Sequence, residues 1–273
     1  MKTAKEMLEA GDLRGAIAAL TDEVKKNPTD TPRRIFLFEL LCFAGEWDRA
    51  EKQIDVIGQQ SPEAALGVLA YRNNLTAERE RARLFATGAA PHFLTEPPAY
   101  IDQHVEAIRH LSAGEAASAR ELLDRAEEER PALSGKWNGE AFEDFRDYDD
   151  FVGPVLELIV KDQYAWLPFE QIRRVEIEAP RKLRDLVWAP ARIEAADQTV
   201  GEVFVPALYA RSSEHASDAV RLGRETQWEP AGDGLVAGAG LRLFLTGDVE
   251  RPVLETRLLE FEAVNSARLP GPS

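Results

Sequence analysis

Gly11-Asp-Leu-Arg-Gly-Ala16 is repeated as Gly45-Glu-Trp-Asp-Arg-Ala50, 34 residues further along the chain, and this repetition decides the fold of the N-terminal half. Pro28 is repeated as Pro62 at the same spacing. A period of this length is typical of tetratricopeptide-like repeats, in which each unit is a pair of antiparallel helices. The glycines suit the tight turn inside each pair, the alanines suit the helix crossing, and the prolines end the second helix.

A later hairpin has the same internal spacing. Gly114 precedes Pro131 by 17 residues, which is the separation of the turn glycine and the proline in the first two units. The unit between them is irregular, because a helix expected over about residues 63–86 is followed by a segment rich in proline and glycine, residues 87–98. We therefore predict about six helices in three hairpins, forming a helical repeat domain over residues 1–131.

Helical hairpins of this kind stack into a superhelix whose concave face commonly holds a peptide or a helix. The first helix of each pair lines that face. In the second and third units, the side chains predicted to point toward it are Ile35, Glu39, Cys42, Phe43, Leu69 and Asn73. The alternative is that the apolar members only fill the core between repeats, as most apolar residues at helical spacing do.

The second half of the chain has a different pattern. We expect residues 132–163 to form an acidic connecting helix, and residues 164–264 to form a smaller C-terminal domain with Trp188 and Trp228 in its own core. Candidate strands with alternating or β-branched residues are Ile172–Glu178, Leu186–Glu194, Glu202–Leu208, Leu241–Leu245 and Val253–Glu262. Their short spacing predicts a mostly antiparallel sheet or half-open barrel, so the fold class is α+β. Residues 265–273 are expected to be a disordered tail.

The net charge of the chain limits the classes of molecule that it can bind. The net charge is −15, and residues 114–162 hold fourteen acidic and six basic residues. Such a surface repels nucleic acid and anionic lipid, whereas basic protein surfaces remain possible partners. The best apolar run, Phe151–Val160, is too short for a membrane span and is interrupted by Glu157. The single cysteine fits a reducing compartment, so we expect a cytoplasmic protein without membrane insertion.

No group of residues has the spacing of a catalytic or metal site. Four aspartates look like a calcium loop at first: Asp144, Asp147, Asp149 and Asp150. Counted from Asp147, however, Phe151 and Val152 stand where an EF-hand needs an oxygen ligand and a glycine. We interpret the cluster as acids at the start of a helix. The glycine-rich segment 232–240 lacks the Lys-Ser/Thr pair of a phosphate loop. We therefore predict a protein that is not an enzyme and takes no metal and no cofactor.

The motifs of the second half, taken together, resemble one bacterial family. In chain order they are Trp137, Asp144, Asp149-Asp-Phe-Val-Gly153-Pro-Val-Leu-Glu157, Tyr164-Ala-Trp166-Leu-Pro168, Leu183-Arg-Asp-Leu-Val-Trp188-Ala-Pro190, Val205-Pro-Ala-Leu-Tyr209, Leu222-Gly-Arg-Glu-Thr-Gln-Trp228 and Leu254-Glu-Thr-Arg-Leu-Leu-Glu-Phe-Glu262. With the preceding hairpins, they are similar to the ImpE/TagJ (SciE-type) accessory proteins of type VI secretion systems over nearly the full length. The segment Gly238-Ala-Gly-Leu-Arg242 departs from the tighter glycine-glutamine-arginine turn expected there.

The resemblance implies a cytoplasmic adaptor at a contractile sheath. Its implied partners are the N-terminal helix of the small sheath subunit (TssB/VipA type) and the sheath-disassembling AAA+ ATPase of the ClpV type. A general tetratricopeptide co-chaperone or regulator unrelated to secretion is the alternative. The family motifs of the C-terminal domain also mark a candidate surface at Arg184, Asp185, Trp188, Arg224 and Trp228. The other interpretation of its charged members is internal ion pairing that fixes the strand connections.

Overall fold

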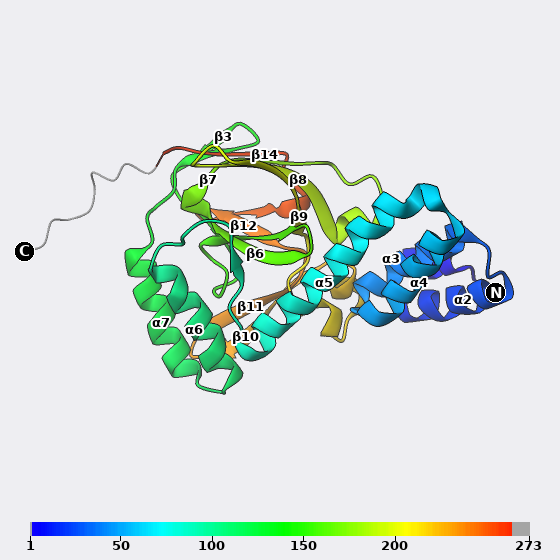
Figure 1. Cartoon of the computed structure of the whole chain (residues 1–273). Coiled ribbons are helices and arrows are strands. Elements are labelled where there is room, and N and C mark those ends of the chain that lie inside the picture. Colours follow the sequence, from blue (N-terminus) through cyan, green and yellow to red (C-terminus); the bar gives the residue numbers. More distant parts are fainter. Residues whose placement is uncertain (1, 264–273) are drawn as a thin grey trace, which may run out of the picture.

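The molecule has a helical half and a strand-rich half, and one long helix belongs to both (Figure 1). The computed structural model describes residues 2–263, so the tail predicted for residues 265–273 lies outside the described residues. The helices are α1 (Ala4–Glu9), α2 (Leu13–Lys26), α3 (Thr31–Phe43), α4 (Trp47–Gln60), α5 (Ala65–Thr87), α6 (Tyr100–Ser112), α7 (Ala116–Glu129) and α8 (Asp218–Arg221). Within residues 2–263, no helix combines the length and the apolar character that crossing a bilayer requires.

The predicted repeat is confirmed by the backbone of the first four helices. Gly11, between α1 and α2, and Gly45, between α3 and α4, have positive φ angles of 82° and 67°, a conformation that glycine adopts without strain. Pro28 and Pro62 follow the ends of α2 and α4. The side chain of Ala50 is fully buried, because α3 and α4 cross closely there.

The later hairpin is formed by α6 and α7, as the sequence predicts. Gly114 lies in its turn with a φ of 79°, and Ala119 and Ala126 are fully buried. This hairpin is separated from the first two by α5, a helix of 23 residues. In Figure 1, α5 runs from the hairpins at the right, past the sheet, to α6 at the lower left.

The C-terminal half is mostly antiparallel sheet. Its strands, with one early strand after α5, are β1 (His92–Phe93), β2 (Gly135–Trp137), β3 (Glu140–Phe142), β4 (Phe145–Asp147), β5 (Val155–Val160), β6 (Gln163–Pro168), β7 (Ile172–Ile177), β8 (Trp188–Ala195), β9 (Val200–Pro206), β10 (Thr226–Gly232), β11 (Leu235–Gly240), β12 (Leu243–Thr246), β13 (Val249–Pro252) and β14 (Leu258–Phe261). Nine strands form one sheet in the order β1-β6-β5-β9-β8-β7-β14-β2-β3. Only its β1–β6 pair is parallel among the described strands.

Two further groups of strands complete this half. A three-stranded sheet has the order β13-β12-β4, and β10 pairs with β11 as a hairpin. Five short 3-10 helices connect the strands and helices: η1 (Pro62–Ala64), η2 (Phe169–Gln171), η3 (Leu183–Leu186), η4 (Ser212–Glu214) and η5 (Val253–Glu255). In Figure 1 the large sheet arches over β12.

Within the large sheet, β5 is buried on both faces, and its successive side chains point to opposite sides. On β5, Leu156 and Leu158 pack in a core with Phe244 of the small sheet. Val155 and Ile159 of the same strand belong to the other core, which the helices share. The sheet is therefore a middle layer between the helices on one side and the small sheet on the other.

The helix expected over residues 132–163 is wrong, because this segment contains β2, β3, β4 and β5. The apolar run 151–160 fits a strand buried on both faces as well as it fits a helix, and sequence periodicity does not distinguish the two. β5 pairs with both β6 and β9, and β2 pairs with β14. The C-terminal sheet thus includes residues before 164, so the expected domain boundary there is wrong too.

The five candidate strands have a mixed outcome. The segments predicted around residues 172–178, 186–194 and 202–208 are β7, β8 and β9, with ends shifted by a few residues. Segment 241–245 is β12, also with shifted ends, and segment 253–262 is split between η5 and β14. The glycine-rich segment 232–240, which is not among the candidate strands, contributes most of the hairpin β10–β11, because small residues allow β11 to pack closely against the ring of Tyr209 at Gly238.

Candidate docking site between the two halves

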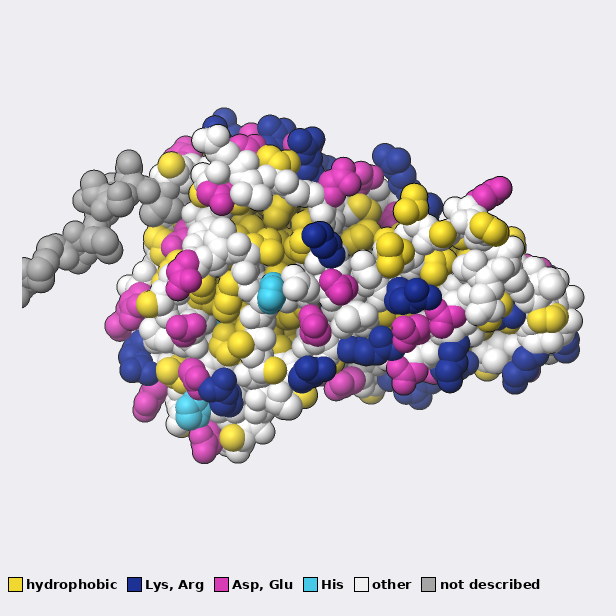
Figure 2. Space-filling model, in the orientation of Figure 1, with side chains coloured by type: hydrophobic (Ala, Val, Ile, Leu, Met, Phe, Trp, Pro, Cys, Tyr) yellow, Lys and Arg dark blue, Asp and Glu magenta, His cyan; other side chains and the backbone are white. Residues whose placement is uncertain are grey.

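The helix α5 positions the junction between the two halves. In its C-terminal part, one stripe of side chains at helical spacing is buried: Asn74, Ala77, Glu78, Arg81 and Leu84. Toward the N-terminus of α5 the helix no longer packs against the sheet, and the side chains of Leu66 and Leu69 are 83% and 52% exposed. Figure 2 shows hydrophobic side chains at the surface over this end of α5, at the upper right.

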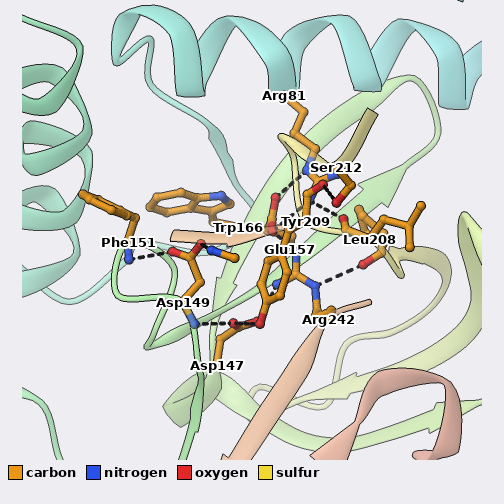
Figure 3. A network of polar contacts seen from close by, with 12 residues as sticks. Arg81, Asp147, Asp149, Phe151, Glu157, Trp166, Leu208, Tyr209, Ser212 and Arg242 are labelled. Atoms are coloured by element: carbon orange, nitrogen blue, oxygen red, sulfur yellow. Dashed lines mark hydrogen bonds and ion pairs between the residues drawn. The ribbon is translucent and has the colours of Figure 1, made fainter. Parts of the chain in front are cut away.

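A buried network of charges joins α5 to the sheet (Figure 3). The Arg81 side chain donates to both carboxylate oxygens of Glu157 on β5, from Nε at 2.7 Å and from Nη2 at 3.2 Å. Arg242, just before β12, donates to the same carboxylate from its other side. Arg242 also donates from Nη1 to Asp147 Oδ2 at 2.5 Å. One carboxylate on the middle layer therefore connects an arginine of the helices with an arginine of the small sheet.

Aromatic side chains complete the hydrogen bonding of this network. The Tyr164 hydroxyl donates to Glu157 Oε1 at 2.5 Å and accepts from Trp166 Nε1 at 2.6 Å. The Tyr209 hydroxyl lies 2.9 Å from Asp147 Oδ1, to which it donates. The network is closed to solvent and its carboxylates are saturated with donors, so it is suited to holding the halves together rather than to chemistry on a substrate.

Burial sets the ionisation behaviour of these groups. Loss of hydration lowers the pKa of Arg242 and raises the pKa of Asp147, and the attraction between the two charges opposes both shifts. The pKa of Asp149 is raised to about 6, mainly by burial and then by the neighbouring charge of Asp147. A buried pair of this kind is weak evidence for stability by itself, but removing one partner typically costs about 3–5 kcal/mol.

The aspartates expected at a helix start have a different role. Asp147 ends β4, and Asp149 lies in the following turn, where it accepts hydrogen bonds from the backbone N–H groups of Phe151 and Gly238 at 2.8 Å each. Asp144 accepts from Arg130, which follows α7. The helix-start interpretation is wrong because the segment is a strand and a turn. Across residues 2–263, no group of three or more histidine, cysteine or acidic side chains is placed to hold a metal ion.

The family-motif residues lie at the junction rather than on one free surface. Arg184 donates to Glu39 Oε1 at 2.8 Å, and its guanidinium lies over the Tyr71 ring at 4.7 Å. Trp188 donates from Nε1 to Glu78 Oε1 at 2.8 Å. The internal-pairing interpretation therefore describes Arg184 well, although its partner lies on α3 and not on a strand connection.

The other three motif residues are dispersed. Asp185 accepts from the backbone N–H groups of Arg181 and Lys182 and so fixes the turn before η3. Arg224 donates to the carbonyl oxygens of Leu8 and Glu9 at the end of α1. Trp228 on β10 packs against Tyr148 and Tyr209. Trp188 and Trp228 thus belong to different packing environments and not to one separate C-terminal core.

The residues predicted for the concave face divide into two groups. Cys42 and Phe43 are 2% and 1% exposed, and Glu39 is held by Arg184, so the chain itself covers this part of α3. Burial raises the pKa of the Cys42 thiol, which also excludes a reactive thiolate there. Ile35 is partly exposed and Leu69 is exposed. Asn73 is partly exposed and borders an open cleft.

Two hollows border the exposed part of α5. The first, which we name the helical groove, has a volume of about 260 Å³ and is mostly apolar. It lies between α3, α4 and α5, with Arg184 at one end, and its residues are Ile35, Phe38, Ile54, Ile57, Glu63, Ala64, Gly67, Val68, Tyr71 and Arg184.

The second hollow, which we name the α5 cleft, has a volume of about 790 Å³ and lies between α5 and the large sheet. Its residues are Ala70, Asn73, Asn74, Ile159, Lys161, Glu176, Ile177, Glu178, Pro190, Ala191, Arg192, Glu202, Val203, Phe204 and Arg257. Both hollows are accessible and their size is that of sites that accept a few side chains.

The buried network itself was missed by sequence reasoning. A usable signal was present, because Glu157 lies within an apolar run and Arg242 lies beside a strand of large apolar residues. Charged residues in such positions are almost never buried without a partner. Their mutual pairing, across 85 positions of sequence, needs the fold itself.

Comparisons with known proteins agree with this architecture. Residues 139–260 match the family model described as ImpE protein, and residues 7–70 match a tetratricopeptide repeat model. The chain is 37% identical over 263 residues to the type VI secretion system accessory component TagJ of Pseudomonas aeruginosa, covering 96% of this chain and 92% of that protein. A crystal structure of a Vibrio parahaemolyticus protein has a TM-score of 0.88 and 29% identity, and the match covers 95% of this chain and 97% of the other.

Proposed function

This chain belongs to the ImpE family, which includes the secretion accessory component TagJ, and we propose on that basis that it is an accessory component of a type VI secretion system. The observation that carries the proposal is the match to TagJ over 96% of the chain. We propose an adaptor role without catalysis, in which the protein binds the N-terminal helix of the small sheath subunit. The sheath-disassembling AAA+ ATPase is its second proposed partner, and the location that we propose with these partners is the cytoplasm.

The helical groove is the surface we assign to the sheath helix. An amphipathic helix binds through a few apolar anchors at helical spacing, and the groove offers partly exposed apolar side chains such as Ile35 and Tyr71. Glu63 is exposed at its rim and is available to a basic residue of the helix. Glu39, which is predicted to face the same surface, is already paired with Arg184.

Gly67 provides a direct test of this assignment. It borders the groove, and a Cβ placed on it meets no heavy atom within 4 Å. Gly67→Glu therefore adds a charged side chain to the groove without a clash, and it replaces a residue that is unfavourable inside a helix. The matched control is Ala82→Glu, at another exposed position of α5 outside the groove.

The experiment is a calorimetric titration of the whole chain with a peptide of the small sheath subunit's N-terminal helix. We expect Gly67→Glu to weaken binding about tenfold or more, with an unchanged or higher melting temperature, whereas Ala82→Glu binds like the wild type. If Gly67→Glu binds the peptide with full affinity, the helical groove is not the binding site. A wild-type chain that binds neither the peptide nor the ATPase would remove the adaptor role.

A further inference from the structure

Asn74 marks a second site that the proposed function does not use. Its side chain is 1% exposed and borders the α5 cleft. Neither its Oδ1 nor its Nδ2 has a hydrogen-bond partner in the part of the chain that the structure describes. Buried side-chain amides are nearly always paired, so an amide that lacks both partners at the border of an open cleft points to a ligand. The complement of one amide donor and one amide acceptor is a peptide group, which offers a C=O and an N–H.

Both sides of the cleft combine polar and apolar residues. On the helix side, Ala70, Asn73 and Asn74 line the cleft, whereas the exposed Leu66, one turn before Ala70, lies outside it. On the sheet side, β8 and β9 present Arg192 and Glu202, which are opposite each other in the strand register. An extended segment turns alternate side chains to opposite sides. It can therefore place charged side chains against Arg192 and apolar side chains against the apolar residues of the same sheet side, among them Val203 and Phe204.

The charges on the sheet side favour an acidic ligand. Three cations line the cleft, and none has a carboxylate oxygen within 4.0 Å among residues 2–263: Lys161, Arg192 and Arg257. The acidic residues are mostly engaged elsewhere, because Glu176 lies 3.0 Å from Arg174 and Glu178 lies 3.8 Å from Arg181. Glu202 alone among the cleft's acids has no cation within that distance in the described chain. The charges left for a ligand are thus mainly positive, on a chain whose net charge is −15.

We propose that the α5 cleft binds an extended, acidic segment of a partner protein. Its apolar side chains lie against Ala70 and the apolar residues of the sheet side, its carboxylates lie against Arg192 and the other two cations, and one of its peptide groups pairs with the Asn74 amide. The segment enters a surface distinct from the helical groove, so the inference stands independently of the sheath helix.

The test uses a labelled octapeptide in which valine and aspartate alternate, with both ends blocked, and fluorescence anisotropy with the whole chain. A second octapeptide carries lysine in place of aspartate. Arg192→Glu removes the central cation of the cleft, and Arg173→Glu is its matched control on β7, exposed and outside the cleft. Asn74→Leu removes the unpaired amide at similar volume, and melting curves of every variant check the fold.

We expect the acidic peptide to bind and the lysine peptide not to bind. Arg192→Glu weakens the acidic peptide about tenfold or more, while Arg173→Glu changes it less than about twofold. Asn74→Leu weakens the peptide and raises the melting temperature, because the free protein no longer buries an unpaired amide. Absence of binding up to about 1 mM, equal binding of both peptides, or full affinity in Arg192→Glu would each overturn the proposal. If Asn74→Leu does not fold, the Arg192→Glu comparison decides alone.

Discussion

Arg184 and Glu39 are 145 positions apart in the chain, and their side chains form a hydrogen-bonded ion pair at 2.8 Å. Glu39 comes from the repeat helices, and Arg184 comes from a family motif of the C-terminal half. Two residues that the sequence marks as separate partner-binding candidates are thus partners of each other. The side of α3 that carries Glu39, Cys42 and Phe43 is therefore covered by other parts of the chain itself.

Glu157 is expected to be the most sensitive polar position. Glu157→Gln removes the charge shared by Arg81 and Arg242 and leaves two buried arginines near each other, which should lower the free energy of unfolding by about 3–5 kcal/mol. Glu51→Gln is the control, because Glu51 pairs with Arg79 at 2.7 Å on a more exposed part of the surface and should cost less than about 1 kcal/mol. Urea unfolding of both variants measures the difference. Equal losses of unfolding free energy in the two variants would show that Glu157 stabilises the fold no more than an exposed ion pair does.

His104 on α6 should make stability depend on pH. Burial lowers its pKa from 6.5 to about 4, and its Nδ1 lies 3.1 Å from the carbonyl oxygen of Phe151. In the unfolded chain His104 binds a proton below about pH 6.5, whereas in the folded chain it does so only near pH 4. The free energy of unfolding is therefore unaffected by this group above pH 6.5 and decreases as the pH falls below that value. The neutral imidazole donates from Nδ1 to that oxygen.

His104→Asn keeps a donor near that oxygen and removes the titration. Relative to this variant, the wild type should lose about 2 kcal/mol of unfolding free energy between pH 7.5 and pH 5. Urea unfolding at the two pH values gives the difference. Asp149, whose raised pKa acts in the opposite direction, is present in both proteins and cancels. Parallel losses in the two proteins would mean that His104 is not held neutral.

Ala50 tests the register of the repeat. Its side chain is fully buried between α3 and α4, so Ala50→Arg overpacks the crossing and buries a charge, at a cost of about 3 kcal/mol or more. Ala86→Arg, at an exposed position of α5, should leave the melting temperature nearly unchanged. Circular dichroism melts compare them, and an unaltered midpoint for Ala50→Arg would contradict the packing described for this hairpin.

A fragment of residues 164–264 is expected not to fold. It lacks β5, which pairs with β6 and β9 inside the large sheet, and β2, which pairs with β14. It also exposes the face that Trp188 and Tyr164 share with the helices. Far-ultraviolet circular dichroism and urea unfolding test this directly. A cooperative transition in the fragment would show that the sheet closes without those strands.

The sequence predicts most of the helical half, because local rules decide it. The glycine at each turn, the buried alanine and the terminating proline act within one hairpin, and their 34-residue period is visible in the chain. The strand-rich half is less predictable. Whether the run 151–160 is a helix or a strand depends on its neighbours on both faces, and those neighbours come from distant segments.

The site is less predictable than the fold for the same reason. Helical spacing places Leu69 and Asn73 near an open surface, and both lie on the exposed part of α5. It equally places Cys42 and Phe43 there, yet these are buried because the second half packs on them. No local pattern shows that, among residues 2–263, the Asn74 amide has no hydrogen-bond partner and Arg192 has no carboxylate partner. Each depends on which distant segments pack beside it.

The long helix α5 also fixes the rotational phase between the two halves. Its 23 residues carry repeat contacts at one end and Arg81 near the other, with about 100° of turn per residue between them. An insertion of a single residue in the middle would swing Arg81 away from Glu157 while leaving every hairpin contact intact. An insertion of seven residues would restore the direction to within about 20°, but it would lengthen the helix by about 10 Å and so separate Arg184 from Glu39. The length of this helix is therefore constrained both by its rotation and by the contacts that the two halves make beside it.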